Sequence, residues 1–230
     1  MAAAAALILF DIDGTLIRKA GPHHRQALEA AVRNITGLAT STDGIPVQGM
    51  LDRKILEEML RRAGAPPRDI ARHMPALVAA AQRIYLRNSP PALHDKVCPG
   101  VRPLLAKLSR RGIPAALVTG NLSRIGWRKM ERAGLRRHFR FGAFAEQAHE
   151  RAGLVHLALR QAARAGWTGP ATPVWLVGDH PNDVYAAKSN GVRSVAVATG
   201  VAPAEELRRA QPDLLVDTLS SLTVETLLDA

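Results

Sequence analysis

The sequence predicts an α/β fold in which helices flank a parallel sheet, with an all-helical cap domain inserted after the first strand. Three observations support it. Short β-rich runs alternate with helical patterns in the second half of the chain, as in right-handed βαβ units. The stretch between the first strand and Pro99 has helical patterns and almost no strand-like run. Polar residues follow directly after several strands, where α/β proteins bind ligands. We expect residues 1–17 and 94–230 to form the core and residues 18–93 to form the cap.

The expected strands of the core are short and apolar. The first is the LILF run that ends immediately before Asp11, and its continuous apolar character is typical of a buried strand. The later strands are Ile113–Thr119, a weaker Phe139–Phe144, Val174–Gly178, Val192–Ala198 and Leu214–Val216. The helical patterns between them cover Val101–Arg111, Leu122–Ala133, Val155–Ala165 and a segment that begins within Asp183–Asn190. This alternation favours a parallel sheet.

The expected cap is helical throughout. Its helical patterns cover His24–Asn34, Arg53–Arg62 and Asp69–Arg87. The breakers Ser89-Pro90-Pro91 and Cys98-Pro99-Gly100 mark its far end. An all-helical insertion directly after the first strand is best explained as a cap on an α/β core.

Composition excludes several classes of protein. Hydrophobic residues make up 47% of the chain and charged residues 22%, as in ordinary globular proteins. No apolar run has the length of a membrane span, so we expect no membrane association. The single cysteine, Cys98, excludes an internal disulfide and a cysteine-based zinc cluster. That composition, and the absence of a basic segment before the first apolar run, favour the cytoplasm.

The net charge of +11 is the unusual feature of the composition. Such a charge can mark a nucleic-acid partner or a preference for anionic substrates. The basic residues, however, are mostly arginines scattered singly or in pairs, and aromatic residues make up only 4% of the chain. Because a nucleic-acid surface usually combines basic blocks with stacking aromatics, we expect nucleic acid not to be the main partner.

Two carboxylates follow the first strand, and packing alone does not explain them. Asp11 and Asp13 are two residues apart, so their side chains point to the same face of an extended chain. Carboxylates on one face repel each other unless a cation lies between them. This pair therefore predicts a metal ion and a phosphoryl group at the end of the strand.

Two further strands end in polar residues. Thr119-Gly120-Asn121 follows the second strand, and Gly178-Asp179-His180-Pro181-Asn182-Asp183 follows a later one. Each motif alone could be a simple helix cap. Because all of them lie at the same end of predicted parallel strands, together they predict one site.

These motifs resemble those of a known superfamily. DIDGTL, then TGN after one hydrophobic strand, then GDHPND after another, is similar to the haloacid dehalogenase-like superfamily of phosphotransferases. The helical insert resembles the C1-type cap of its phosphoglycolate phosphatase-like members. The resemblance covers nearly the whole chain and implies a Rossmann-like core. It also implies Mg²⁺-dependent hydrolysis of a small-molecule phosphomonoester through an aspartyl-phosphate intermediate.

The resemblance implies roles for the first motif. Asp11 is expected to be the nucleophile that attacks phosphorus. Asp13 is expected to protonate the leaving group and then to act as base for the attacking water. Gly14 would allow the tight chain exit, and Thr15 would support the loop.

The resemblance also implies the metal ligands. Side-chain oxygens of Asp11 and Asp179 and the backbone carbonyl of Asp13 would hold Mg²⁺, which prefers a few carboxylates and open positions for water and phosphate. Asp183, one helical turn after Asp179, would hold metal-bound water.

The phosphoryl group would be bound by the second motif and one basic residue. Thr119 would offer its hydroxyl, and Gly120 and Asn121 would bind at the helix start. The family uses a Lys or Arg before the third motif, and its common Lys-Pro pair is missing here. We choose Arg151, since arginine suits bidentate phosphate binding. Arg140 and Lys129 stay open as substitutes.

Residues toward the cap are candidates for substrate contact. His180 departs from the small hydroxyl residue often found at its position. Arg18, with His23 and His24, lies at the cap entrance, and Arg53 follows a Gly49-Met50-Leu51-Asp52 turn that resembles a cap turn facing the site. We expect Arg18, Arg53 and His180 to contribute to binding.

Other activities of the superfamily remain to be weighed. Hydrolytic dehalogenases and phosphonate hydrolases lack an acid two residues after the nucleophile, so Asp13 argues against both. A sugar phosphomutase keeps both aspartates, and the motifs do not distinguish it from a phosphatase. A non-catalytic or nucleic-acid-associated protein is the alternative of a different class, and the presence of Asp11, Asp13 and Asp179 argues against it.

Overall fold

A computed structural model describes residues 4–228 and contains one six-stranded sheet. Every strand pair is parallel, and the order is β3-β2-β1-β4-β5-β6. The strands are β1 (Leu7–Phe10), β2 (Ala115–Val118), β3 (Phe139–Ala143), β4 (Val174–Gly178), β5 (Arg193–Val197) and β6 (Leu214–Val216). The parallel α/β core expected from the sequence is confirmed. Because β1 lies between β2 and β4, the topological switch point falls at the strand that Asp11 directly follows.

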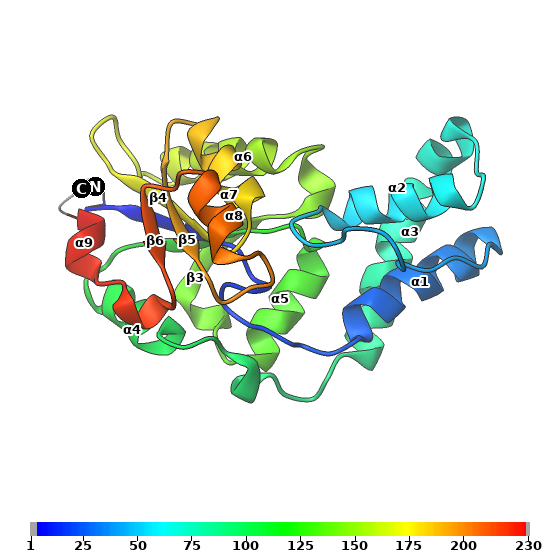
Figure 1. Ribbon diagram of the computed structural model, residues 1–230, viewed down its shortest axis with the longest axis horizontal. Coiled ribbons are helices and arrows are strands. Elements are labelled where there is room, and N and C mark those ends of the chain that lie inside the picture. The colour runs from blue at the N-terminus through cyan, green and yellow to red at the C-terminus, as the bar shows by residue number, and fades with distance from the viewer. Residues whose placement is uncertain (1–3, 229–230) are drawn as a thin grey trace.

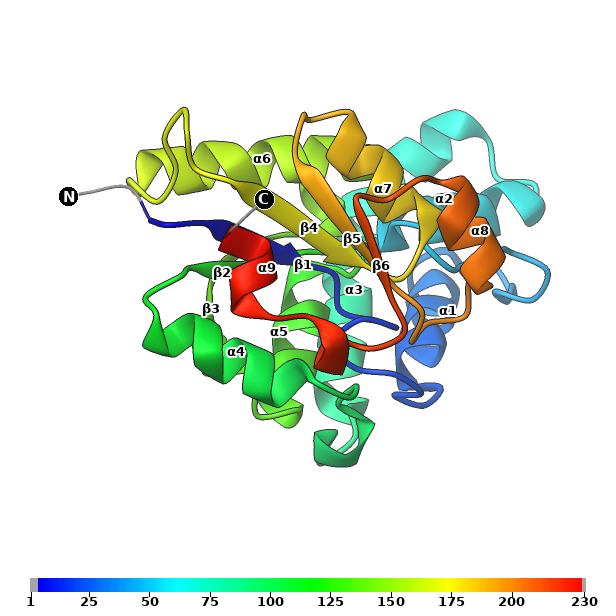
Figure 2. The same ribbon diagram turned by 60° about the vertical axis from the view of Figure 1, so that its left-hand side comes forward.

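Helices cover both faces of the sheet, and this explains why β1 is apolar at every position. Leu7 and Leu9 face one side, where they pack in a cluster with residues of α6 (Arg151–Arg164) and α7 (Pro181–Lys188). Ile8 and Phe10 face the other side and pack with α4 (Val101–Arg110) and α9 (Val224–Leu228). Figure 2 shows these helices on opposite sides of the strands. The remaining core helices are α5 (Ser123–Arg132) and α8 (Ala204–Arg209).

Two core helices begin earlier than the apolar pattern predicts. α6 starts at Arg151 and not Val155, because its first turn, Arg151-Ala152-Gly153-Leu154, lacks an apolar pattern although Arg151 is itself buried. α7 starts at Pro181 and not Asp183, because proline is favoured in the first turn and His180 caps the helix. The first shift places Arg151, a charged side chain of the candidate site, on a rigid helix.

Three helices stand beside the carboxyl end of the sheet (Figure 1). They are α1 (His23–Thr36), α2 (Asp52–Arg62) and α3 (Pro67–Asn88), and we refer to residues 23–88 as the three-helix segment. α1 packs closely on α3, and Leu28, Leu56 and Leu77 are fully or almost fully buried between the helices. The segment meets the core where α3 packs on α5 and where α2 contacts residues 145–147.

Short 3₁₀ turns connect the main elements: η1 (His94–Lys96), η2 (Arg136–His138), η3 (Ala145–Gln147) and η4 (Leu219–Ser221). Among residues 4–228, none of the helices combines the length and the apolar character that crossing a bilayer requires.

Candidate active site

A cavity of about 420 Å³ lies between the carboxyl ends of the strands and the three-helix segment. Asp11, Asp13, Asn121, Arg151 and Asp179 line it from the core. From the other side it is lined by His24, Arg25, Leu28, Thr42, Val47, Gln48, Gly49, Met50, Asp52 and Ile55. The topology therefore brings the three polar motifs together, as the sequence predicts.

The turn after β1 is built around a close approach to Asp179. Gly14 has a φ of +86°, and a Cβ at this position would lie 2.1 Å from Oδ2 of Asp179. Thr15 donates to Oδ1 of the same carboxylate at 3.1 Å. The Gly14 carbonyl oxygen in turn accepts a hydrogen bond from Thr199 at 2.5 Å. Glycine is thus required at this turn by backbone conformation and by space.

Three buried carboxylates meet at the end of β1 and β4. Oxygens of Asp11, Asp179 and Asp183 lie within 4.8 Å of one another. Their one buried cationic partner among the described residues is Arg151, which lies 2.5 Å from Oδ1 of Asp183 and 3.4 Å from Oδ1 of Asp11. Oδ1 of Asp11 accepts no hydrogen bond from any residue between 4 and 228. Three negative charges against one guanidinium leave an excess that a divalent cation would balance.

The electrostatics of the cluster point the same way. Burial, together with repulsion from Asp11 and Asp183, raises the pKa of Asp179 to about 8. Burial also raises the pKa of Asp183, with Asp11 adding to the rise and Arg151 opposing it. The carboxylates around Arg151 raise the pKa of its guanidinium against the effect of burial. A cation bound here would remove the mutual repulsion, so the donor set fits Mg²⁺, which binds through carboxylate oxygens.

Arg151 is the basic residue that lines the cavity beside the carboxylate cluster. Its side chain is buried, and Nη2 would lie 3.4 Å from a Cβ at Gly120. The Nε group is buried and has no partner among the described residues. Arg140 lies exposed on β3 and does not line the cavity. The arrangement favours Arg151 over Arg140 as the phosphate-binding residue.

The Thr119-Gly120-Asn121 motif is used partly in a way that the sequence did not predict. Thr119 is completely buried, and its Oγ1 accepts hydrogen bonds from the backbone and side-chain nitrogens of Asn121. The Asn121 N–H, which we expected from the sequence to bind the phosphoryl group, is therefore directed at Thr119 instead. The Asn121 side chain also donates to Oδ2 of Asp13 at 2.8 Å. The carbonyl of Gly120 accepts the backbone N–H of Asp52 at 2.7 Å, which docks α2 on this loop.

Lys129 holds Asp13. Its ammonium lies 2.6 Å from Oδ2 of Asp13 and 2.7 Å from Oδ1 of Asn121. Burial opposes ionisation of Asp13, but Lys129 and Asn121 together keep the pKa of Asp13 below its usual value. Since Lys129 is already occupied by these contacts, it is a poor candidate for the phosphate-binding residue.

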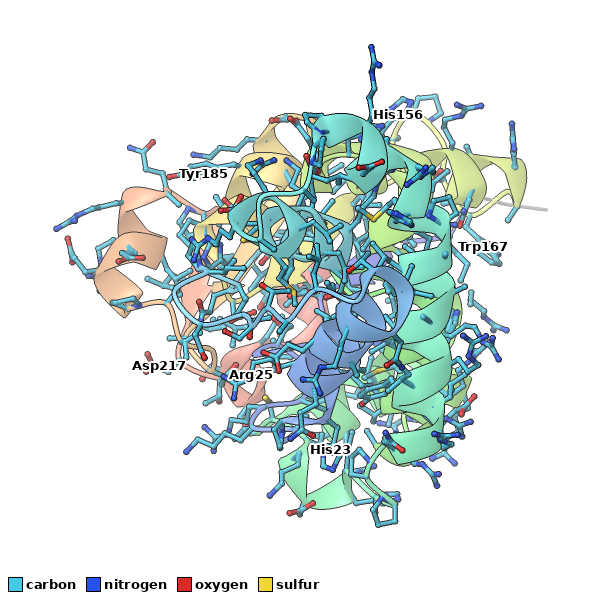
Figure 3. All side chains as sticks on the ribbon, turned by 90° about the vertical axis from the view of Figure 1, so that its right-hand side faces the viewer. His23, Arg25, His156, Trp167, Tyr185 and Asp217 are labelled. Carbon is cyan, nitrogen blue, oxygen red and sulfur yellow. The ribbon has the colours of Figure 1, made fainter. Side chains whose placement is uncertain are left out.

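The substrate candidates near the three-helix segment divide into two groups. Arg18 and His180 both line the cavity, and Arg18 is exposed. His180 packs against Gly49, since a Cβ on Gly49 would lie 2.3 Å from Nδ1 of His180. Burial and Arg151 lower the pKa of His180. Arg53 lies on α2 outside the residues that line the cavity. Figure 3 shows His23 and Arg25 projecting from the start of α1.

Several residues of the site escaped the sequence analysis. Asp52 is 2% exposed and accepts hydrogen bonds from His24 and from the backbone of Leu122. In the sequence it has the pattern of an ordinary acidic residue in a first helical turn. Gly200 lies so close to Asp179 that a Cβ would be 1.7 Å from its Oδ2. The Thr199-Gly200 pair at the end of β5 was a signal that could have been found, since it follows another parallel strand.

Comparison with known proteins agrees with this architecture. A family model for haloacid dehalogenase-like hydrolases matches residues 5–191. A phosphoglycolate phosphatase from Synechococcus elongatus is 32% identical over 224 residues, which cover 94% of this chain and 94% of the relative. CbbY from Rhodobacter sphaeroides, solved in complex with phosphate, has a TM-score of 0.71 at 23% identity and covers 97% of this chain and 99% of its own. A beta-phosphoglucomutase from Clostridium difficile has a TM-score of 0.70 at 18% identity, with 100% and 96% covered. The two structural similarities concern the fold alone.

Proposed function

Because the chain belongs to the haloacid dehalogenase-like hydrolase family and is a phosphoric monoester hydrolase, we propose that it hydrolyses a small-molecule phosphomonoester through a phosphorylated Asp11. One observation carries the proposal: a buried Asp11 oxygen without a hydrogen-bond partner among the described residues, beside Arg151, Asp179 and Asp183, at the wall of a cavity. Oriented oxygens next to one guanidinium suit a nucleophile facing a phosphoryl group.

In the first step Asp11 attacks phosphorus and the bond to the ester oxygen breaks. Arg151 would bind the transferring phosphoryl oxygens, with the free hydroxyl hydrogen of Thr119 as a further donor. Asp13 gives its proton to the leaving alkoxide. A bound phosphate ester brings negative charge close to Asp13 and so raises its pKa, which favours the protonated form when it is needed.

In the second step a water molecule attacks the phosphorus of the Asp11 phosphate. Asp13, now a carboxylate, takes a proton from that water as the bond between phosphorus and Asp11 breaks. Inorganic phosphate leaves and the starting protonation is restored. Mg²⁺ held by Asp11, Asp179 and the Asp13 carbonyl, with Asp183 beside them, would shield the attacking carboxylate from the charge of the phosphate.

The proposed substrate carries a second anionic group. Phosphoglycolate is the first candidate, because the relative from Synechococcus elongatus is named a phosphoglycolate phosphatase. Arg18, Lys19 and Arg25 lie on the cavity wall contributed by the chain between β1 and α1 and by α1 itself. Their charges suit a carboxylate or a second phosphate. Residues 18–93 would then act as the cap that selects the ester and excludes water. We infer that the reaction takes place in the cytoplasm, because a chain with the single cysteine Cys98 suits a reducing compartment.

The test is hydrolysis of an aryl phosphate and of phosphoglycolate, with Mg²⁺ and with excess EDTA. We expect phosphate release that needs Mg²⁺ and that falls at least about a thousandfold in Asp11→Asn, since the nucleophile is lost. Asp69→Asn, at a half-exposed aspartate on α3 that pairs with Arg72, is the matched control and should retain wild-type activity.

Two results would contradict the proposal. Undiminished turnover in Asp11→Asn would exclude Asp11 as the nucleophile. Transfer of phosphate from one sugar phosphate to another, without release to water, would identify a phosphomutase.

A further inference from the structure

We propose that Lys129 is a positioning residue that fixes the Asp13 carboxylate for proton transfer. We infer further that His24 and Asp52 tie this position to the docking of the three-helix segment. The inference rests on the proposed function, because that function assigns Asp13 the roles of general acid and general base. It concerns residues that the motifs do not contain.

The first observation is how deeply Lys129 is buried. Its side chain is 1% exposed, although it is charged and lies on an amphipathic helix whose arginine residues reach solvent. An unpaired ammonium at such a position would cost several kcal/mol. Its Nζ makes three contacts: 2.6 Å to Asp13, 2.7 Å to Asn121 and 3.1 Å to His24. Three N–H donors meet three acceptors, so the ammonium is fully satisfied.

The contacts fix the orientation of the Asp13 carboxylate. Both Lys129 and Asn121 bind the same oxygen, Oδ2. Oδ1 accepts no hydrogen bond from residues 4–228, and the half-exposed side chain lines the cavity. When the acid is protonated, two donors on Oδ2 leave Oδ1 as the place for the proton. Asp13 is thereby anchored by one oxygen and free to exchange a proton through the other.

The anchor continues into the three-helix segment. A lysine only donates, so Nδ1 of His24 accepts from Lys129 and the ring proton lies on Nε2. Nε2 donates to Oδ2 of Asp52 at 2.8 Å, and Tyr85 packs edge-on against the ring. Both helices α1 and α2 are thus joined to the acid through Lys129.

Asp52 closes the connection back to the core. Its Oδ2 also accepts the N–H of Leu122, just before α5, at 2.8 Å. Its own N–H donates to the Gly120 carbonyl at 2.7 Å. These contacts can form only while α2 is docked on the Thr119-Gly120-Asn121 loop. Asp13 is therefore held in the productive orientation when the segment covers the cavity.

The experiment compares esters whose leaving groups need different amounts of protonation. Phosphoglycolate and glycerol 3-phosphate release a strongly basic alkoxide, whereas p-nitrophenyl phosphate releases a weak base that leaves without a proton. kcat and KM are measured with saturating Mg²⁺ for wild type, Lys129→Met and Asp13→Asn. kcat/KM reports the step in which the ester bond breaks, so it separates the two classes of ester.

We expect Lys129→Met to lower kcat/KM about 100-fold for the alkyl esters and about tenfold or less for the aryl ester, mostly through kcat. Asp13→Asn should show the same asymmetry, and more strongly. Lys107→Met, which removes an exposed charge on α4, is the matched control and should behave as wild type. A merely structural role would lower both classes by one common factor. Equal losses for the two classes, or no loss, would overturn the role of Lys129.

Asp52→Asn is the second variant, and it carries the test alone if Lys129→Met does not fold, as judged by thermal unfolding. It should show the same asymmetry at about tenfold for the alkyl esters. A wild-type ratio between the ester classes would overturn the link to the segment. If wild type itself releases no phosphate from any ester, the proposed function fails, and this outcome is distinct from a failure of the positioning role.

Discussion

At the scale of single residues, Gly14 shows how the backbone is fitted to the carboxylate cluster. Its φ lies in the left-handed region, and the space that a Cβ would fill is taken by Asp179. Gly64 has a similar φ of +79°, but nothing lies within 4 Å of its Cβ position. Comparing substitutions at the two glycines therefore distinguishes the cost of backbone strain from the cost of the close contact with Asp179.

We predict that Gly14→Ala lowers the free energy of unfolding by more than about 3 kcal/mol, since strain and a displaced carboxylate add up. Gly64→Ala should cost about 1 kcal/mol, from strain alone. Urea unfolding measures both. Magnesium affinity, followed by titration, should fall only in Gly14→Ala. Equal costs in the two variants would show that the contact with Asp179 is unimportant.

The sequence predicts those residues of the site that stand in short motifs, and not those that reach the site only through packing. Asp11, Asp13 and Asp179 stand in short motifs at strand ends, so parallel topology alone was enough to bring them together. The resemblance predicts a basic residue before the third motif, and Arg151 at such a position contacts Asp11 and Asp183 in the structure. Lys129 is separated from Asp13 by 116 positions, and a lysine on an amphipathic helix ordinarily points to water. Its role could not be predicted without the packing of α5.

At the scale of elements, the docking of α2 includes one close approach of two backbones, in addition to the hydrogen bonds of Asp52. A Cβ at Gly120 would lie 2.3 Å from the Met50 carbonyl oxygen. His180 and Asn182, at the start of α7, contact Gly49 in the same loop. The three-helix segment thus meets two of the three motif loops directly. The sequence predicted its helices, but not these contacts, because glycine in a TGN motif also fits a simple helix start.

We predict that Gly120→Ala separates this loop from α2 and lowers kcat/KM at least about tenfold, because the cavity loses its cover. Gly153→Ala, at a glycine within α6 without a positive φ whose Cβ would come no closer than 3.0 Å to the Cβ of Ala148, is the control and should leave kcat/KM near the wild-type value. Limited proteolysis should cut the 47–51 loop faster in Gly120→Ala. Unchanged kinetics and unchanged proteolysis would argue against docking through Gly120.

At the scale of the whole molecule, we expect the carboxylate cluster to couple stability to pH and to magnesium. The pKa of Asp179 rises from the usual 3.8 to about 8 in the folded protein, so the metal-free fold keeps a proton that the unfolded chain releases. A folded-state pKa above the unfolded value contributes stability that is lost as pH rises toward that pKa.

We therefore predict that Tm in EDTA falls between pH 6.5 and pH 8.5, and that excess Mg²⁺ restores most of the loss by taking the place of the proton. Differential scanning calorimetry measures both effects. Asp179→Asn, which carries no charge to titrate, should show a much flatter Tm over this interval. A wild-type Tm that stays constant or rises with pH in EDTA would contradict the coupling.

The sheet order has a consequence for the chain as it is made. β1 is the first strand to be synthesised, yet both of its neighbours, β2 and β4, come from much later in the chain. At about 5–20 residues per second, on the order of ten seconds pass before β4 can emerge. Until β2 emerges the apolar strand LILF has two open edges, and until β4 emerges it still has one that any other strand can meet. The strand that precedes Asp11 is thus a part of the nascent protein that benefits from protection by chaperones.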